Sequence, residues 1–189
     1  MSNLAREIRD DIRDSLQMAR YSRDIWWLMV SEHPERVRFG EGMERFIRFF
    51  DPTLTAHYVN FVVTLASLYD ASKDAFSLNR LFDLVEPNPS PSGKPTLSVR
   101  TALNAATAVG RRLYLIRSKR IVHRTDKVLT RDIYAEASLT YDETKDLLQQ
   151  SQAVFSDLSY HLDRTREDFS DSAEPDFRAL LNAISAMAS

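Results

Sequence analysis

The hydrophobic residues of this chain recur at intervals of three, four and seven positions, which is the periodicity of amphipathic helices. From about residue 2 to 31 they form one stripe: Leu4, Ile8, Ile12, Leu16, Ala19, Trp26 and Val30. We expect a loop through Gly40 and Gly42 next, then a short helix over about 43–50. The Asp51-Pro52 pair is a good N-cap and first-turn combination, so it predicts the start of a third helix.

The second half of the chain has the same periodicity, with clearer start signals. Ser77 is expected to cap a short helix that buries Leu78, Leu81, Phe82 and Val85. Four prolines within 87–95 predict a loop. A long helix over about 96–122 should follow, with its apolar stripe at Ala102, Ala106, Val109, Leu113 and Ile116. Thr140 to Glu143 reads as a capping box that opens a helix to about residue 164.

This pattern predicts an all-α fold, because no segment alternates as a strand does. We expect one bundle of four main helices with additional short helices, formed by residues 1–165. Residues 166–189 should form a polar linker and an amphipathic C-terminal tail helix that needs a covering surface. Its apolar positions are Phe177, Leu180, Leu181, Ile184 and Met187.

The composition excludes several kinds of functional site but does not identify the function. The 189 residues carry a net charge of −2 and contain no Cys, which excludes disulfides, thiolate zinc sites and Cys nucleophiles. Gly-rich phosphate loops, Glu-x-x-His pairs and His-x-x-x-His pairs are absent, and we expect no metal and no cofactor. The most apolar stretch, residues 25–30, is too short to span a bilayer, so we expect a soluble cytoplasmic protein without membrane association.

Positive charge is concentrated in one segment. Eight of the 25 Lys and Arg residues lie within 111–131, where Asp126 is the only acidic residue. This is a patch suited to phosphate, although it could equally be a solvated helix face neutralised by acidic residues elsewhere. Continuing the stripe of Leu113 and Ile116 by helical steps reaches Arg120 and His123. Because burying an unpaired charge is costly, these residues should either have a charged or polar partner or serve a function.

Two sets of residues resemble one known family. Arg117 and His123, separated by five residues near the end of a long helix, resemble the Arg-x4-6-His motif of HEPN domains. The stretches 65–70 (LASLYD) and 77–82 (SLNRLF) are similar to the HEPN branch related to the abortive-infection protein AbiU2. The resemblance covers roughly residues 1–165 and implies a HEPN-like helical bundle. Active HEPN proteins are metal-independent ribonucleases that dimerise so that two motifs face one cleft.

The resemblance therefore implies that this chain has a site that binds and cleaves RNA. Arg117 and His123 would be the catalytic pair, with Ser118 orienting them, and the residues holding RNA phosphate would be Lys119, Arg120, Arg124 and Lys127. A His can transfer protons near neutral pH, and the fork of an Arg suits phosphate oxygens. On an ideal helix the two positions are about 120° apart, so either the helix frays at His123 or a second subunit completes the site.

Two functions stay open at this point. One is a homodimeric toxin-like ribonuclease of a defence system, with an antitoxin or another protein as a further partner. The other is a catalytically silent HEPN-like bundle that binds RNA or a protein.

Overall fold

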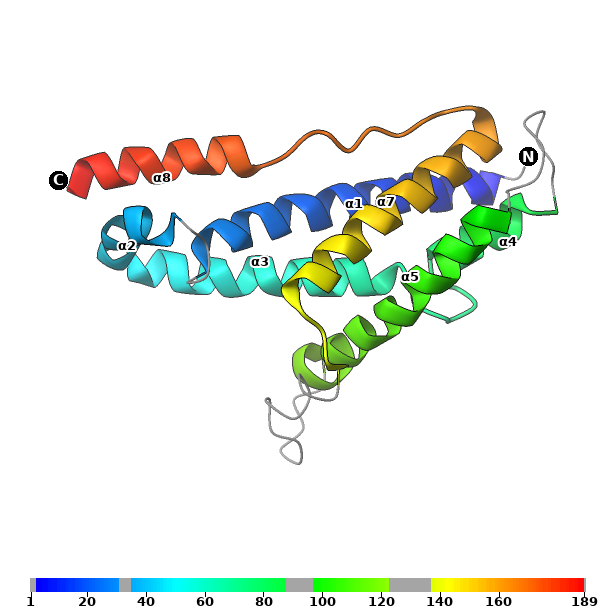
Figure 1. The fold of residues 1–189 in the computed structure, drawn as a ribbon, viewed down its shortest axis with the longest axis horizontal. Coiled ribbons are helices and arrows are strands. Elements are labelled where there is room, and N and C mark those ends of the chain that lie inside the picture. Colours follow the sequence, from blue (N-terminus) through cyan, green and yellow to red (C-terminus); the bar gives the residue numbers. More distant parts are fainter. Residues whose placement is uncertain (1–2, 31–34, 88–96, 123–136, 189) are drawn as a thin grey trace. The chain divides into compact units, whose positions relative to one another are not determined.

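The computed structural model describes residues 3–30, 35–87, 97–122 and 137–188. These residues form helices and connecting segments without any strand, which confirms the predicted all-α fold with four long helices, short helices and a tail helix. The elements are α1 (Asn3–Met29), α2 (Arg36–Arg45), α3 (Ile47–Ser67), α4 (Leu78–Val85), α5 (Leu97–Ile116), η1 (Arg117–Val122), α7 (Tyr141–Asp163) and α8 (Glu174–Ala188) (Figure 1).

The chain divides into two compact units. The first consists of Met1–Gln17 and Val62–Phe169, and the second of Met18–Phe61 and Ser170–Ser189. The boundary falls within α1 and α3, so each of these helices contributes to both units. The division into a bundle over 1–165 and a tail over 166–189 stays a prediction.

In the first unit, α4 forms as its sequence signals predict. The Ser77 side chain accepts a hydrogen bond from the backbone N–H of Arg80, which satisfies one of the donors left open at a helix start. The predicted apolar residues Leu78, Leu81, Phe82 and Val85 are all buried. Burying each such side chain contributes about 1.5–3 kcal/mol, so a short helix can be held by its packing alone.

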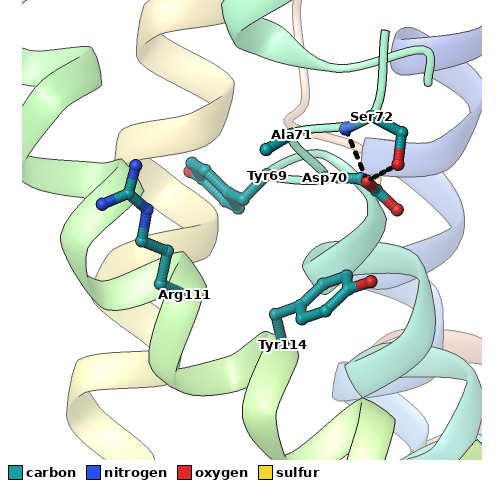
Figure 2. A pocket seen from close by; sticks show the side chains of 6 residues that line it. All are labelled: Tyr69, Asp70, Ala71, Ser72, Arg111 and Tyr114. Carbon is teal, nitrogen blue, oxygen red and sulfur yellow. Dashed lines mark hydrogen bonds between the residues drawn. The ribbon is translucent and has the colours of Figure 1, made fainter. Parts of the chain in front are cut away.

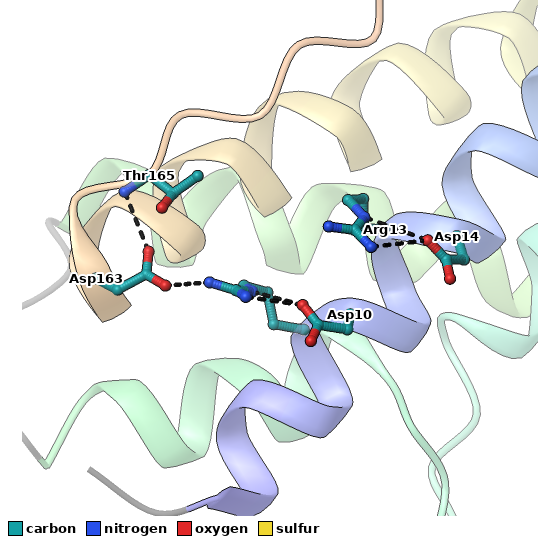
Figure 3. Close-up of polar contacts among 6 residues, drawn as sticks. Asp10, Arg13, Asp14, Asp163 and Thr165 are labelled. Carbon is teal, nitrogen blue, oxygen red and sulfur yellow. Dashed lines mark hydrogen bonds and ion pairs between the residues drawn. The ribbon is translucent and has the colours of Figure 1, made fainter.

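Helix α7 also begins and ends on recognisable caps. Thr140 and Glu143 form the predicted capping box, and Arg164 ends the helix in the left-handed conformation at φ 68°. At that end the Asp163 carboxylate accepts the Thr165 N–H at 3.1 Å and pairs with Arg9 of α1 (Figure 3). Burial raises the pKa of Asp163, but the Thr165 hydrogen bonds and the Arg9 charge outweigh it and hold that pKa below its usual value. The ion pair therefore joins α1 to α7.

The second unit corrects the expected loop through Gly40 and Gly42. Both glycines lie inside α2, which packs along α8 (Figure 1). A Cβ on Gly42 would come within 3.1 Å of the Ile184 side chain, so this glycine permits the close approach of the two helices. Their shared core covers Phe177, Leu181 and part of Ile184 of the tail helix, whereas Leu180 and Met187 are exposed. This core contains Leu28, Met29, Phe39, Met43, Phe50, Phe177 and Leu181.

The expected short helix over 43–50 and the helix start at Asp51-Pro52 are also wrong. Helix α3 begins at Ile47, and Pro52 lies inside it. Proline removes one main-chain donor from the helix, but only within its second turn. The side chains of Thr53 and Thr55 donate to the Phe49 and Asp51 carbonyls, at 2.6 and 3.2 Å, and so provide further hydrogen bonds around this proline.

Helix α5 buries three residues of the predicted stripe, Ala106, Leu113 and Ile116, and Val109 is partly buried. Ala102 is exposed, whereas the buried residues are Val99, Leu103, Ala106, Gly110, Leu113 and Ile116. Gly110 faces the ring of Tyr69, and a Cβ there would lie 2.3 Å from Tyr69 Cγ. The helix also leaves α geometry earlier than expected, because residues 117–122 form a π-helical turn.

The close contact at Gly110 predicts a large effect of one methyl group. Gly110→Ala should lower the free energy of unfolding by about 3 kcal/mol, because the buried ring of Tyr69 must move and the gain in helix propensity is only about 1 kcal/mol. Urea unfolding followed by circular dichroism measures this. Gly40→Ala is the matched control, because its Cβ would meet only the end of the Arg36 side chain at 3.0 Å. The control should be neutral or stabilising, and equal losses in both variants would contradict the argument.

Candidate nucleic-acid site at the end of α5

Arg117 is held at the junction between α5 and η1 by a carboxylate from the end of α3. Its Nη1 lies 3.4 Å from Asp70 Oδ2. Asp70 is itself fixed, because its Oδ1 accepts hydrogen bonds from the backbone N–H of Ser72, at 2.9 Å, and from the Ser72 hydroxyl. These hydrogen bonds from Ser72, with the charge of Arg117, lower the pKa of Asp70 against the opposing effect of its burial. The ion pair with Asp70 therefore fixes the position of the Arg117 guanidinium at the junction between α5 and η1.

Tyr114 provides a second contact to the same guanidinium. The Arg117 Cζ lies 5.1 Å from the centre of the Tyr114 ring, within the range of a cation–π interaction. The Arg117 side chain is 25% exposed, and its Nε is buried without a hydrogen-bond partner among the described residues. Arg117 is therefore oriented by two neighbours and retains unused donor capacity.

Tyr69 fixes the position of Asp70, the next residue in the chain. Its ring lies against Gly110 of α5, and its hydroxyl is 2.5 Å from Ser151 Oγ of α7. Ser151 donates its own proton to the Leu147 carbonyl at 2.6 Å, so Tyr69 is the donor in the shared bond. Burial raises the pKa of Tyr69 well above its usual value, and the phenol stays protonated.

A cavity of about 400 Å³ opens beside this pair (Figure 2). Its lining comes from the segment that follows α3 and from α5. The lining residues are Tyr69, Asp70, Ala71, Ser72, Arg111 and Tyr114. Two of them, Asp70 and Tyr114, are also the neighbours of Arg117.

The basic segment is partly neutralised by carboxylates that are distant in sequence. Besides the pairing of Arg117 with Asp70, Arg112 binds Glu143 Oε1 at 2.8 Å and donates to the Ala137 carbonyl at 2.7 Å. Arg111 differs, because it is exposed and has no ion pair within the described part of the chain. The expected patch is therefore a mixture of structural and available cations.

The structure describes only part of the predicted site. Ser118 and Lys119 lie on η1 beside Arg117 and are partly buried. Arg120 also lies on η1, but its side chain is outside the described residues, as are His123, Arg124 and Lys127. The catalytic pairing of Arg117 with His123 therefore stays a prediction.

Two other histidines, His57 and His161, lie among the described residues. His161 is buried on α7, and His57 is partly buried on α3, where loss of solvation lowers its pKa. Within the described ranges, no three His, Asp or Glu side chains are grouped so that they could hold a metal ion.

Comparison with known proteins identifies the family. The family model for AbiU2, a HEPN family, matches residues 1–180. The chain belongs to the AbiU2 family of HEPN proteins. No curated protein and no solved structure gave a match. None of the helices described for this HEPN protein is both long and apolar enough to cross a membrane.

Sequence reasoning missed the residues that orient Arg117 in this HEPN protein. Asp70 lies 47 positions away from Arg117, and no local pattern joins the two. One signal was available for Gly110, since an isolated glycine inside a helix often marks a close contact. Tyr114 lies three residues before Arg117, the spacing of neighbours on one helix face, and could have been inferred from α geometry.

The Asp70–Arg117 pair predicts a pH-dependent stability. The folded-state pKa of Asp70 lies below the unfolded value of about 3.9, so its contribution is present above that value and is lost as pH falls through the folded-state pKa. Asp70→Asn should lower the free energy of unfolding by about 2 kcal/mol at pH 7, and the difference from wild type should narrow below about pH 4.

Urea unfolding across pH 3–7 measures this difference. Asp83→Asn, at an exposed position on α4, is the control and should leave the stability nearly unchanged. A loss at Asp70 that stays constant down to pH 3 would show that the carboxylate does not act through its charge.

Proposed function

We propose that this AbiU2-family protein is a metal-independent endoribonuclease in which Arg117 and His123 act on an RNA phosphodiester. The observation that carries the proposal is the orientation of Arg117 by Asp70 and Tyr114 at the helix end that leads to His123. π-helical turns are frequent at functional sites, and η1 begins at Arg117 itself. Ser118 would orient this pair.

The chemistry needs only groups that the chain can supply. The RNA 2′-oxygen attacks phosphorus and loses its proton to a base, while the bond to the 5′-oxygen breaks and that oxygen gains a proton from an acid. His123 would transfer these protons. Arg117 would stabilise the charge on the phosphate oxygens with donors that Asp70 does not use, and Lys119, Arg120, Arg124 and Lys127 would hold neighbouring phosphates.

We further propose that the active form is a homodimer with the two motifs facing one cleft. The contact region we propose is the long helix over about residues 100–123 with its neighbours, because a contact there could bring the motifs of the two subunits together. An antitoxin or another protein partner would then act by covering this cleft.

One observation favours a second function, a silent bundle that binds RNA or a protein. Arg117 is partly buried and already paired with Asp70, and such an ion pair can have a purely structural role. In that case Arg117→Ala would destabilise the protein without changing any reaction.

Variants of the pair distinguish the two functions. Wild type should cleave RNA equally with and without a chelator, and His123→Ala should lose at least about a hundredfold in rate while still binding RNA, because proton transfer typically contributes that much. Arg117→Ala should weaken both cleavage and binding. Arg48→Gln, an exposed arginine of the second unit, is the charge control and should cleave as wild type does. Folded His123→Ala protein that cleaves normally would leave the silent bundle as the better account.

A mixing experiment tests the dimer with the same two variants. If Arg117 of one subunit acts with His123 of the other, a dimer of one Arg117→Ala and one His123→Ala chain keeps one complete site. Cleavage should then return when the two inactive proteins are mixed and allowed to exchange subunits. A monomer mass in light scattering at micromolar concentration, together with no recovery on mixing, would contradict the shared site.

A further inference from the structure

We propose that the cavity beside Arg117 binds a single ribonucleotide, and that it holds the nucleotide next to the phosphate on which Arg117 acts. The position next to that phosphate rests on the proposed function, whereas the binding site follows from the cavity itself. Its volume of about 400 Å³ lies within the range of small-ligand sites, and its lining combines an aromatic ring, a carboxylate and an exposed cation.

The carboxylate of Asp70 has acceptor capacity left for a ligand. A carboxylate offers about four lone-pair sites. Ser72 uses two of them on Oδ1, and Arg117 uses one on Oδ2. The remaining site can accept a ribose hydroxyl or the amino group of a base. Because Ser72 holds the carboxylate in place, this acceptor is already oriented before a ligand arrives.

The aromatic part of the lining comes from two tyrosines with different roles. Tyr69 is buried, and its hydroxyl is committed to Ser151, so it serves as a fixed wall. Tyr114 is only partly buried, and its hydroxyl has no hydrogen-bond partner within the described ranges. Figure 2 shows the Tyr114 side chain and Asp70 on the same side of the site. An accessible aromatic ring is the group on which proteins stack unpaired bases.

Arg111 supplies the charge that a phosphate requires. It lines the cavity, is exposed, and lacks the carboxylate partner that Arg112 and Arg117 each have in the described chain. Arg111 and Tyr114 are three residues apart on α5 and both line the cavity, and Figure 2 shows their side chains on different sides of it. A stacking ring, an oriented acceptor and an available guanidinium match the base, sugar and phosphate of one nucleotide.

Binding of AMP, GMP, CMP and UMP, each titrated separately and followed by NMR, tests the site. At least one should bind wild type, and Tyr114→Leu should weaken that binding about tenfold or more through loss of stacking. Tyr114→Phe, which keeps the ring, should bind several-fold more tightly than Tyr114→Leu. Arg111→Gln should weaken binding of the monophosphate but not of the matching nucleoside, and Arg48→Gln should bind as wild type does.

The outcomes separate this site from the ribonuclease proposal. If no monophosphate binds at millimolar concentration, or if binding ignores both Tyr114→Leu and Arg111→Gln in folded proteins, the cavity is not a nucleotide site, even where cleavage depends on His123. If binding depends on Tyr114 and Arg111 while His123→Ala cleaves RNA as wild type does, the result supports the nucleotide site and contradicts the catalytic role of Arg117 and His123. Thermal unfolding of each variant establishes that it is folded.

Discussion

The packing of Tyr69 between two helices is the constraint on which the site depends. Its ring lies on Gly110, where no larger residue fits, and its hydroxyl donates to Ser151 of α7. These contacts fix the end of α3, and the next residue, Asp70, is the one that holds Arg117. The close packing of Tyr69 on Gly110 in the core of the first unit therefore determines where Asp70 holds Arg117.

The same arrangement explains how a slightly acidic protein can present a usable cation. Arg112 and Arg117 each have a carboxylate partner, and each ion pair joins two segments of the chain. An Arg that is both paired and in contact with an aromatic ring loses little further side-chain entropy when it binds phosphate. Arg111 is exposed and has no ion pair among the described residues, so its charge can act on a ligand. The oriented cation, Arg117, therefore lies at the start of η1, and the exposed cation, Arg111, lies on α5 just before it.

Local sequence signals predicted the start of several helices correctly. They failed for residues whose role depends on contacts with distant parts of the chain. The Ser77 cap and the Thr140 capping box start α4 and α7 as predicted, because each signal and its partner lie within one turn. Gly42 resembles a loop residue in its local sequence, because its role depends on contacts with α8, more than 130 positions further on. Asp70 was missed for the same reason, and the family resemblance rather than any local pattern indicated Arg117 and His123.

The chemical ends of the RNA products give the most direct test of the central claim, that this HEPN protein uses the RNA 2′-hydroxyl as nucleophile with Arg117 and His123. Mass spectrometry of a short RNA cleaved by wild type should find a 2′,3′-cyclic phosphate or its hydrolysis product on one fragment and a 5′-hydroxyl on the other. A substrate with 2′-deoxyribose at the scissile position should stay intact. Fragments with 5′-phosphate ends, or cleavage of the deoxy substrate, would contradict the account.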